Sequence, residues 1–399
     1  MIDVNAVNAG SVIETQSFPA RSGPAVHLVD TTMFFCAYGG GVKRYLKAKQ
    51  AWFRRVRSVR HSLVVPPQSN ADEDVSECHA AYIPLPGGYC FPLDGRVWRD
   101  QLVALKPHLI EAGDPYVPGW SAVHAGQHLG IPTVAFFHSD LPRMLQQRAG
   151  SWIRPIARHY LRHLYREFDS VLAPSHTTLS QLREWGIARA VLQPMGVDME
   201  IFHPNKRSDV LREHLSLAAE TRLLIYAGRF SREKNLHVLE EAVKRLGHPY
   251  HLLLVGGGTT GRRTSHVTVL PYEADSCRLA TLLASADAFV HAGDQETFGL
   301  VAVEALACGL PAVVVEGGAL PELVDDSVGV TAPRPTASDM AAAITALFTR
   351  DMDRVRIAAR KRAVDHFSWA TAFAHLTRHY ARLLGRPALA HGALIHALP

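Results

Sequence analysis

One stretch, residues 291–315, constrains this chain more than any other: HAGDQETFGLVAVEALACGLPAVVV. From position 300 to 308 every side chain is apolar or small except Glu304. Gly309, followed closely by a proline, is typical of a helix end. The pattern therefore predicts a helix from about 298 to 308 and then a buried strand at 312–315.

Glu304 is unusual because an unpaired carboxylate on an apolar helix is costly to bury, so we expect it to have a polar partner or a ligand. Glu296 lies eight residues earlier, about 12 Å away along a helix axis. That distance resembles the span from a ribose across a diphosphate to a sugar. The amides of Phe298, Gly299 and Leu300 would lie at the positive helix end, where anions bind. These features indicate a clamp for a nucleotide-diphosphate sugar. Alternatively, Glu296 is a surface turn residue and Glu304 is a salt-bridged core residue.

Glu296 and Glu304, separated by TFGLVAV, resemble the paired-glutamate motif of the retaining family-4 glycosyltransferases with the GT-B fold. The resemblance covers most of residues 25–384. It implies an α/β protein with two Rossmann-like, doubly wound domains that face each other across a cleft. The implied divisions are an acceptor-binding domain at 1–203, a nucleotide-sugar-binding domain at 204–369, and a C-terminal helix and tail at 370–399 that pack back on the first domain.

Length and composition agree with a two-domain protein. The chain has 399 residues, is 47% hydrophobic and 20% charged, and carries a formal net charge of +5, which is ordinary for a soluble protein. No zinc spacing or RNA-binding signature is present, so we expect no nucleic-acid partner. Five cysteines without a Cys-x-x-Cys pair favour reduced thiols in the cytoplasm. The sequence contains neither a signal-peptide pattern nor an apolar run of about 18 residues, so we expect no transmembrane helix.

The N-terminal half alternates predicted strands and helices. A strand at 25–29 leads to a glycine cluster that includes Gly40 and Gly41, and such a cluster permits close backbone approach to a ligand. A buried strand at 132–137 ends at His138, on the edge where ligands of doubly wound sheets bind. By themselves, these features also fit an ordinary turn and a hydrogen-bonded histidine at a strand end.

The C-terminal half repeats this alternation, which predicts a second parallel sheet. A strand at 223–227 is followed by Arg229 and Lys234 in a loop where cations can meet phosphate oxygens. A further strand at 269–272 brings Tyr272 to the edge of the expected nucleobase pocket. The ordinary alternative for the two cations is a surface position.

The resemblance implies a site and a reaction for these residues. In the family, Glu296 binds sugar hydroxyls, Glu304 binds ribose hydroxyls and His138 supports the sugar, while the leaving phosphate accepts the acceptor proton on the same face. The implied catalytic residues are His138, Arg229, Lys234 and Glu296. The implied donor-binding residues are Gly40, Gly41, Arg229, Lys234, Tyr272, Glu296, Phe298, Gly299, Leu300 and Glu304.

The predicted function is the transfer of a hexose, of the glucosyl or mannosyl type, from a UDP- or GDP-sugar to a lipid-linked or saccharide acceptor. The alternatives are a nucleotide-sugar 2-epimerase-like isomerase and a non-catalytic nucleotide-sugar binding module. We expect no cofactor and no metal, because cationic side chains take the role of a divalent ion. Asp72, Glu73 and Asp74 formally match a Mn²⁺-binding pattern of another transferase fold, but they fall in a predicted surface loop at 66–80.

Two basic segments lie in the predicted acceptor domain. Residues 43–60 carry eight lysines and arginines without an acidic residue, and residues 153–166 place arginines at four-residue spacing between apolar side chains. Such segments can bind an anionic membrane surface, or they can be solvated helix faces. The first alternative predicts a cytoplasmic protein attached to the inner face of the membrane.

Overall fold

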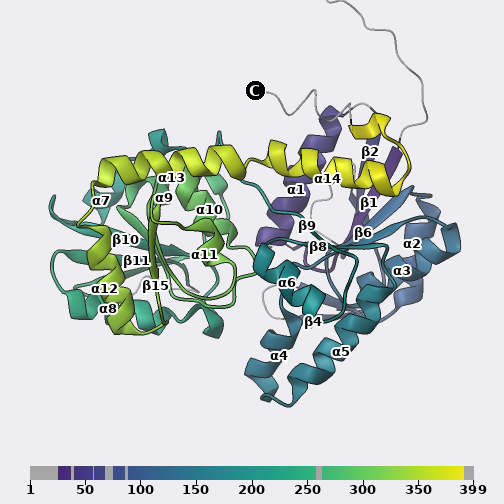
Figure 1. The fold of residues 1–399 in the computed structure, drawn as a ribbon, viewed down its shortest axis with the longest axis horizontal. Helices are drawn as coiled ribbons and strands as arrows, with labels where there is room; N and C mark the ends of the chain where they lie inside the picture. Colours follow the sequence, from purple (N-terminus) through teal and green to yellow (C-terminus); the bar gives the residue numbers. More distant parts are fainter. Residues whose placement is uncertain are drawn as a thin grey trace, which may run out of the picture.

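The computed structural model describes residues 26–36, 40–56, 58–67, 75–85, 89–257 and 263–390. These residues form two parallel sheets, one in each half of the chain (Figure 1). The strand order is β3-β2-β1-β6-β7-β8-β9 in the N-terminal domain and β12-β11-β10-β13-β14-β15 in the C-terminal domain. The predicted fold class, two Rossmann-like domains of the GT-B type, is confirmed.

The N-terminal domain contains a seven-stranded sheet, a small antiparallel hairpin and helices on both sheet faces. Its strands are β1 (Val26–Thr31), β2 (Val59–Val65), β3 (Val75–Glu77), β6 (Leu109–Ala112), β7 (Thr133–Phe136), β8 (Ser170–Ala173) and β9 (Ala190–Leu192). The hairpin is β4 (Tyr82–Leu85) with β5 (Tyr89–Pro92). Its helices are α1 (Gly41–Arg55), α2 (Gly95–Ala104), α3 (Val117–Leu129), α4 (Leu141–Ala149), α5 (Ile153–Arg166) and α6 (His176–Glu184).

The C-terminal domain contains a six-stranded sheet. Its strands are β10 (Arg222–Ala227), β11 (Tyr250–Gly257), β12 (Val267–Pro271), β13 (Ala288–His291), β14 (Ala312–Val315) and β15 (Gly329–Ala332). Its helices are α7 (Val210–His214), α8 (Leu236–Leu246), α9 (Ser276–Ser285), α10 (Leu300–Ala307), α11 (Leu320–Leu323), α12 (Ala337–Leu347) and α13 (Met352–His366), with 3₁₀ turns η1 (Pro204–Lys206) and η2 (Arg232–Lys234).

Apolar residues on successive strand positions pack on opposite sheet faces, as the period of two requires. In β1, Leu28 belongs to the core that contains α1, whereas Val29 belongs to the core that contains α2, α3 and α5. In β10, Ile225 and Tyr226 likewise enter different cores. The α1 core continues into the C-terminal domain through α9 and α10, so one apolar cluster joins the two domains.

The last helix, α14 (Trp369–Leu383), crosses back to the N-terminal domain, whereas α13 lies over the C-terminal domain (Figure 1). Tyr380 of α14 anchors this return. Its hydroxyl accepts a 2.7 Å hydrogen bond from Lys49 Nζ, which also lies 2.8 Å from Asp30 and 2.9 Å from Glu111. The sequence placed Lys49 within a basic surface segment, and this was wrong, because its side chain is fully buried in this ionic cluster.

Two other local expectations need correction. The helix predicted from 298 begins at Leu300, because Gly299 adopts the left-handed conformation (φ 93°) and serves as the N-cap. The predicted loop at 66–80 contains a short edge strand, β3, which pairs with β2. The two basic segments, 43–60 and 153–166, lie on different sides of the domain, because α1 and α5 pack on opposite faces of the N-terminal sheet.

Candidate donor-binding site

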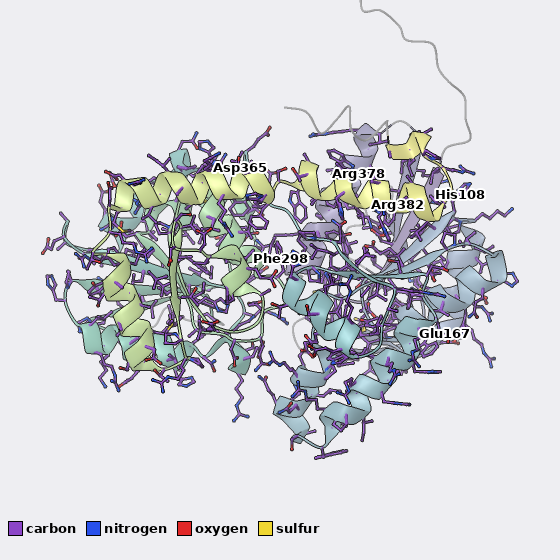
Figure 2. The ribbon with its side chains drawn as sticks, in the orientation of Figure 1. His108, Glu167, Phe298, Asp365, Arg378 and Arg382 are labelled. Carbon is purple, nitrogen blue, oxygen red and sulfur yellow. The ribbon has the colours of Figure 1, made fainter. Side chains whose placement is uncertain are left out.

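A cavity of about 210 Å³ lies between the two domains. It is lined by every predicted site residue except Glu304: Gly40, Gly41, His138, Arg229, Lys234, Tyr272, Glu296, Phe298, Gly299 and Leu300. Phe298 lies between the domains in Figure 2. Residues that are far apart in the sequence therefore converge on one site.

Two helix N-termini face this cavity. Helix α1 of the N-terminal domain begins at Gly41, after the N-cap Gly40, and α10 of the C-terminal domain begins at Leu300. They approach so closely that a Cβ on Gly41 would lie 3.6 Å from Leu300 Cδ2. Each helix start carries a partial positive charge and amides without intrahelical partners. The pair forms a binding place for an anionic group such as a diphosphate.

Glu296 is held by two residues of the C-terminal domain. Lys234 Nζ donates to Glu296 Oε1, and His291 Nε2 lies 3.1 Å from the same oxygen. The amide of Gly293 donates to His291 Nδ1 at 3.0 Å, so Nε2 carries the ring proton and donates to Glu296. Burial favours the neutral acid, but Lys234 and His291 outweigh it and hold the pKa of Glu296 well below its usual range. The carboxylate is therefore a permanent hydrogen-bond acceptor in the cavity wall.

Arg229 lies two residues after the end of β10 and is exposed, so its guanidinium is a cation available to a ligand in this cavity. Its backbone is fixed by Tyr226, whose hydroxyl donates to the Arg229 carbonyl at 3.2 Å. Gly228 between them has φ 147°, a conformation that strongly favours glycine. The β10 loop thus positions a cation beside the two helix starts.

His138 lies on the opposite side of the cavity, just beyond β7. Its ring stacks on Phe136 with centroids 4.0 Å apart, and Tyr45 meets it edge-on at 5.4 Å. Burial, assisted by Lys49, lowers the pKa of His138 to about 3. Its Nε2 is buried and has no hydrogen-bond partner among the described residues. His138 is thus a neutral imidazole with one nitrogen available to a ligand.

Hydrogen bonds between the domains fix His138 and Glu296 on opposite sides of the cavity. Thr297 Oγ1 donates to the carbonyl of His138 at 2.8 Å, and Thr178 Oγ1 donates to the Thr297 carbonyl at 3.1 Å. The carboxylate of Glu322 accepts from two amides at the start of α6, at 2.8 and 2.6 Å. These hydrogen bonds join the two domains directly beside the cavity.

The resemblance implies that Glu304 contacts the donor, but Glu304 is not among the residues that line the cavity. It is buried in α10, and its Oε1 accepts from Arg44 Nη1 of α1 in the other domain. Its Oε2 is buried and has no partner among the described residues. Burial raises the pKa of Glu304, and Arg44 opposes this shift. Arg44 itself lines the cavity.

Sequence reasoning missed several residues of the site. Besides Arg44, the cavity lining includes Tyr226, His291 and Thr297. His291 could have been found, because it ends a buried strand five residues before Glu296, on the sheet edge where ligands bind. Arg44 carried a weaker signal, its place one turn beyond the Gly40–Gly41 helix start.

The described residues contain no group of three or more His, Cys, Asp or Glu side chains arranged to hold a metal ion. Asp72, Glu73 and Asp74 lie outside the described residues. No helix in the described part of the chain is long and apolar enough to span a bilayer.

Comparison with known proteins places this geometry in a family. Residues 39–201 match the model of "Glycosyltransferase Family 4", and residues 208–364 match "Glycosyl transferases group 1". A GDP-mannose-dependent alpha-mannosyltransferase of Mycobacterium tuberculosis is 30% identical over 348 residues, which cover 83% of this chain and 90% of that protein. A GDP-mannose-dependent alpha-(1-6)-phosphatidylinositol dimannoside mannosyltransferase of the same species is 32% identical over 311 residues, or 74% and 79% of the two chains.

Solved structures agree with the fold. Sucrose-phosphate synthase from Thermosynechococcus elongatus superposes with a TM-score of 0.75 at 21% identity, covering 90% of this chain and 99% of that one. The Anabaena protein HepE in complex with UDP-glucose superposes with a TM-score of 0.70 at 18% identity, covering 89% and 99%. The chain therefore belongs to the family-4 glycosyltransferases of the GT-B fold, which are hexosyltransferases that use nucleotide-sugar donors.

Proposed function

We propose that this protein transfers mannose from GDP-mannose to a lipid-linked acceptor at a membrane surface, with retention and without a metal ion. The observation that carries the proposal is the convergence of two helix N-termini, Arg229 and Lys234 on one cavity between the domains. The relatives named above are GDP-mannose-dependent, and one is named for a phosphatidylinositol dimannoside acceptor.

The positive groups that line the cavity support this transfer reaction. Departure of a nucleoside diphosphate builds negative charge on its terminal phosphate, and preorganised cations and amides stabilise that charge best in a site that excludes water. Arg229 and the starts of α1 and α10 supply such groups. Lys234, paired with Glu296, keeps that carboxylate ionised as an acceptor for sugar hydroxyls. This set takes the role of a divalent cation in the proposed reaction.

The position of Glu273 favours guanine as the nucleobase of the donor. A second cavity, of about 220 Å³, shares Arg44 and Tyr272 with the first and is lined by Glu273. Guanine presents N1–H and N2–H donors side by side, and a carboxylate can accept both. Uracil presents one N–H between two carbonyl acceptors, which a carboxylate matches poorly. Glu273→Gln should therefore reduce the preference for GDP over UDP.

Of the two basic segments, the one in the helix pair α4 and α5 is a better candidate for membrane contact than the one in α1. It projects from the N-terminal domain (Figure 1). Trp152, between the two helices, is 63% exposed and Ile156 is 55% exposed, beside exposed Arg154 and Arg158. Each cation near an anionic leaflet contributes about 1 kcal/mol to the binding free energy. The apolar side chains can insert between the lipid headgroups and strengthen binding further. In α1 the aromatic residues Trp52 and Phe53 are buried in the core, so that segment offers charge without an apolar face.

The transfer reaction is tested with GDP-mannose radiolabelled in the sugar and vesicles that contain an inositol phospholipid. Label that enters the lipid extract supports the proposal. Release of labelled mannose at the same rate without acceptor indicates hydrolysis. A label that stays on the nucleotide as a different sugar indicates an epimerase, and nucleotide binding without any product indicates a binding module. Each of these three outcomes contradicts the proposal.

Membrane contact is tested by sedimentation with anionic and neutral vesicles over a salt series. The double variant Trp152→Ser/Arg158→Ser should lose binding to anionic vesicles. A control with the exposed α1 residues replaced, Lys47→Ser/Arg55→Ser, should bind like the wild type. Wild-type protein that neither vesicle type retains at low salt would contradict the membrane part of the proposal while leaving the donor site untouched.

A further inference from the structure

A third cavity, of about 460 Å³, lies at the edge of the C-terminal sheet opposite to the donor cavity. Its lining includes Arg222, the first residue of β10, and Asp287, which directly precedes β13. The donor cavity instead contains the last residues of the same two strands, Ala227 and His291. The length of the strands therefore separates the two cavities, and the third takes no part in the proposed transfer.

Positive charge dominates this third cavity, which we call the arginine cavity. Its lining carries four arginines and two carboxylates: Arg207, Arg212, Arg222, Arg356, Asp209 and Asp287. The arginines come from the segment after η1, from α7, from β10 and from α13, so four elements bring cations to one place. Asp209, and Asp353 beside the cavity, are exposed and form no ion pair with these arginines in the described structure. Asp287 is the carboxylate that pairs with them.

Three of the four arginines share this one carboxylate. Asp287 lies 3.6 Å from Arg207 and 3.2 Å from Arg356, and it also pairs with Arg212. The carbonyl of Ala286 accepts from both Arg207, at 3.3 Å, and Arg356, at 3.2 Å. Burial, assisted by Arg207, lowers the pKa of Arg356, although Asp287 opposes this shift. The group is thus held in place and keeps a net positive charge.

Arg222 has no carboxylate partner in the described part of the chain. Uncharged groups fix its guanidinium: Nη1 donates to the Tyr250 hydroxyl at 2.7 Å, and the group lies 4.7 Å from the ring centroid of Phe348 and 5.3 Å from that of Tyr250. Its Nε and Nη2 donate to none of the described residues. A planar cation with two remaining donors matches the oxygens of a phosphate group.

We propose that the arginine cavity binds a phosphate group, carried by a small soluble molecule or by a lipid headgroup, at a site separate from the donor cavity. Contacts within the protein already fix the guanidinium groups, so binding has to order few side chains. An ion network that only stabilises the sheet edge accounts for the three arginines at Asp287 but not for Arg222. The bound phosphate supplies the counter-charge for Arg222 and links β10 to α7 and α13. This inference does not depend on the proposed function.

Calorimetry with inorganic pyrophosphate tests the proposal, and two replacements separate the two cavities. Arg222→Met leaves every ion pair of Asp287 intact, whereas Arg229→Met removes a cation from the donor cavity. The wild type should show two binding events. Arg222→Met should weaken one by about tenfold or more, the size of a hydrogen bond to a charged group, and Arg229→Met should weaken the other. Arg245→Met removes an exposed cation from the last turn of α8 and should bind like the wild type.

The outcomes decide both the site and the carrier of the phosphate. Equal pyrophosphate binding by the wild type and Arg222→Met would overturn the proposal, as would a single binding event that only Arg229→Met weakens. If Arg222→Met does not fold, Arg207→Met takes its place, because the Arg207 side chain is 41% exposed, and unchanged binding in that variant overturns the proposal. Retention on vesicles that contain phosphatidylinositol 4-phosphate, lost in the arginine variant, assigns a lipid headgroup. Pyrophosphate binding that depends on the arginine, without such retention, assigns a soluble molecule.

Discussion

Replacing Lys234 by Met should destabilise the protein through Glu296. The ion pair is largely enclosed, with 15% of the Lys234 side chain and 22% of the Glu296 side chain exposed. Removing one partner of a buried pair costs about 3–5 kcal/mol. Because some solvent reaches this pair and His291 still donates to the carboxylate, we expect the lower end, about 3 kcal/mol at pH 8.

The pH dependence of this loss identifies its cause. In the wild type, Lys234 keeps the pKa of Glu296 well below its usual range, so the pair contributes throughout pH 5–8 and is lost only as pH falls below the unfolded carboxyl value of about 4.3. In the variant, burial dominates and the carboxyl group takes up a proton as pH falls towards 5. The difference in unfolding free energy between wild type and variant should therefore narrow from pH 8 to pH 5.

Urea denaturation followed by tryptophan fluorescence measures this difference. Arg232→Met, which removes an exposed cation from the same 3₁₀ turn, should cost less than about 0.5 kcal/mol. In a Glu296→Gln background the Lys234 replacement should cost about 1 kcal/mol or less, because no buried charge is left unpaired. An equal cost in both backgrounds, or a cost equal to that of Arg232→Met, would refute the reasoning.

Three further predictions follow from the site. Glu304→Ala should abolish GDP binding in calorimetry, whereas Glu296→Gln should mainly lower turnover; unchanged affinity in the Glu304 variant contradicts the assignment. A chelator should leave the transfer rate nearly intact, and strict Mn²⁺ dependence would contradict this. His138→Asn should reduce acid sensitivity: because burial lowers the pKa of His138 to about 3, the unfolded chain, with a histidine pKa of about 6.5, takes up the proton first, and the wild type loses about 2 kcal/mol from this residue between pH 7.5 and 5. A variant with the same loss contradicts the burial of a neutral imidazole.

The sequence predicts the fold well because its strongest signals are local. Apolar strands followed by glycine turns and capped helices repeat in both halves, and strand 312–315 has the predicted bounds. The side chains at the carboxyl ends of strands also follow from this pattern, since one topology brings them to one sheet edge. His138 could thus be placed at the edge of the first sheet, and Arg229 and Lys234 at the edge of the second. Only the family resemblance implied that the two edges face one site, which they do.

The errors arise where a side chain's surroundings are set by distant residues. Lys49 has the sequence context of a surface cation, but Asp30, Glu111 and Tyr380 surround it from other elements. The Arg44–Glu304 pair joins positions 260 residues apart, and no local pattern identifies such a contact. The sequence also could not show that the two basic segments lie on opposite sheet faces, because amphipathicity does not say which sheet face a helix covers.

The protein should transfer a hexose from a nucleotide donor to an acceptor with retention of the anomeric configuration. Proton NMR of a single reaction with GDP-α-mannose and acceptor tests it most directly. Loss of the donor's anomeric signal should match the growth of GDP and of a new α-anomeric signal in equal amounts, and only when acceptor is present. A β-anomeric product would contradict retention, and free mannose or an altered nucleotide sugar in place of a glycosylated acceptor would contradict the assigned reaction.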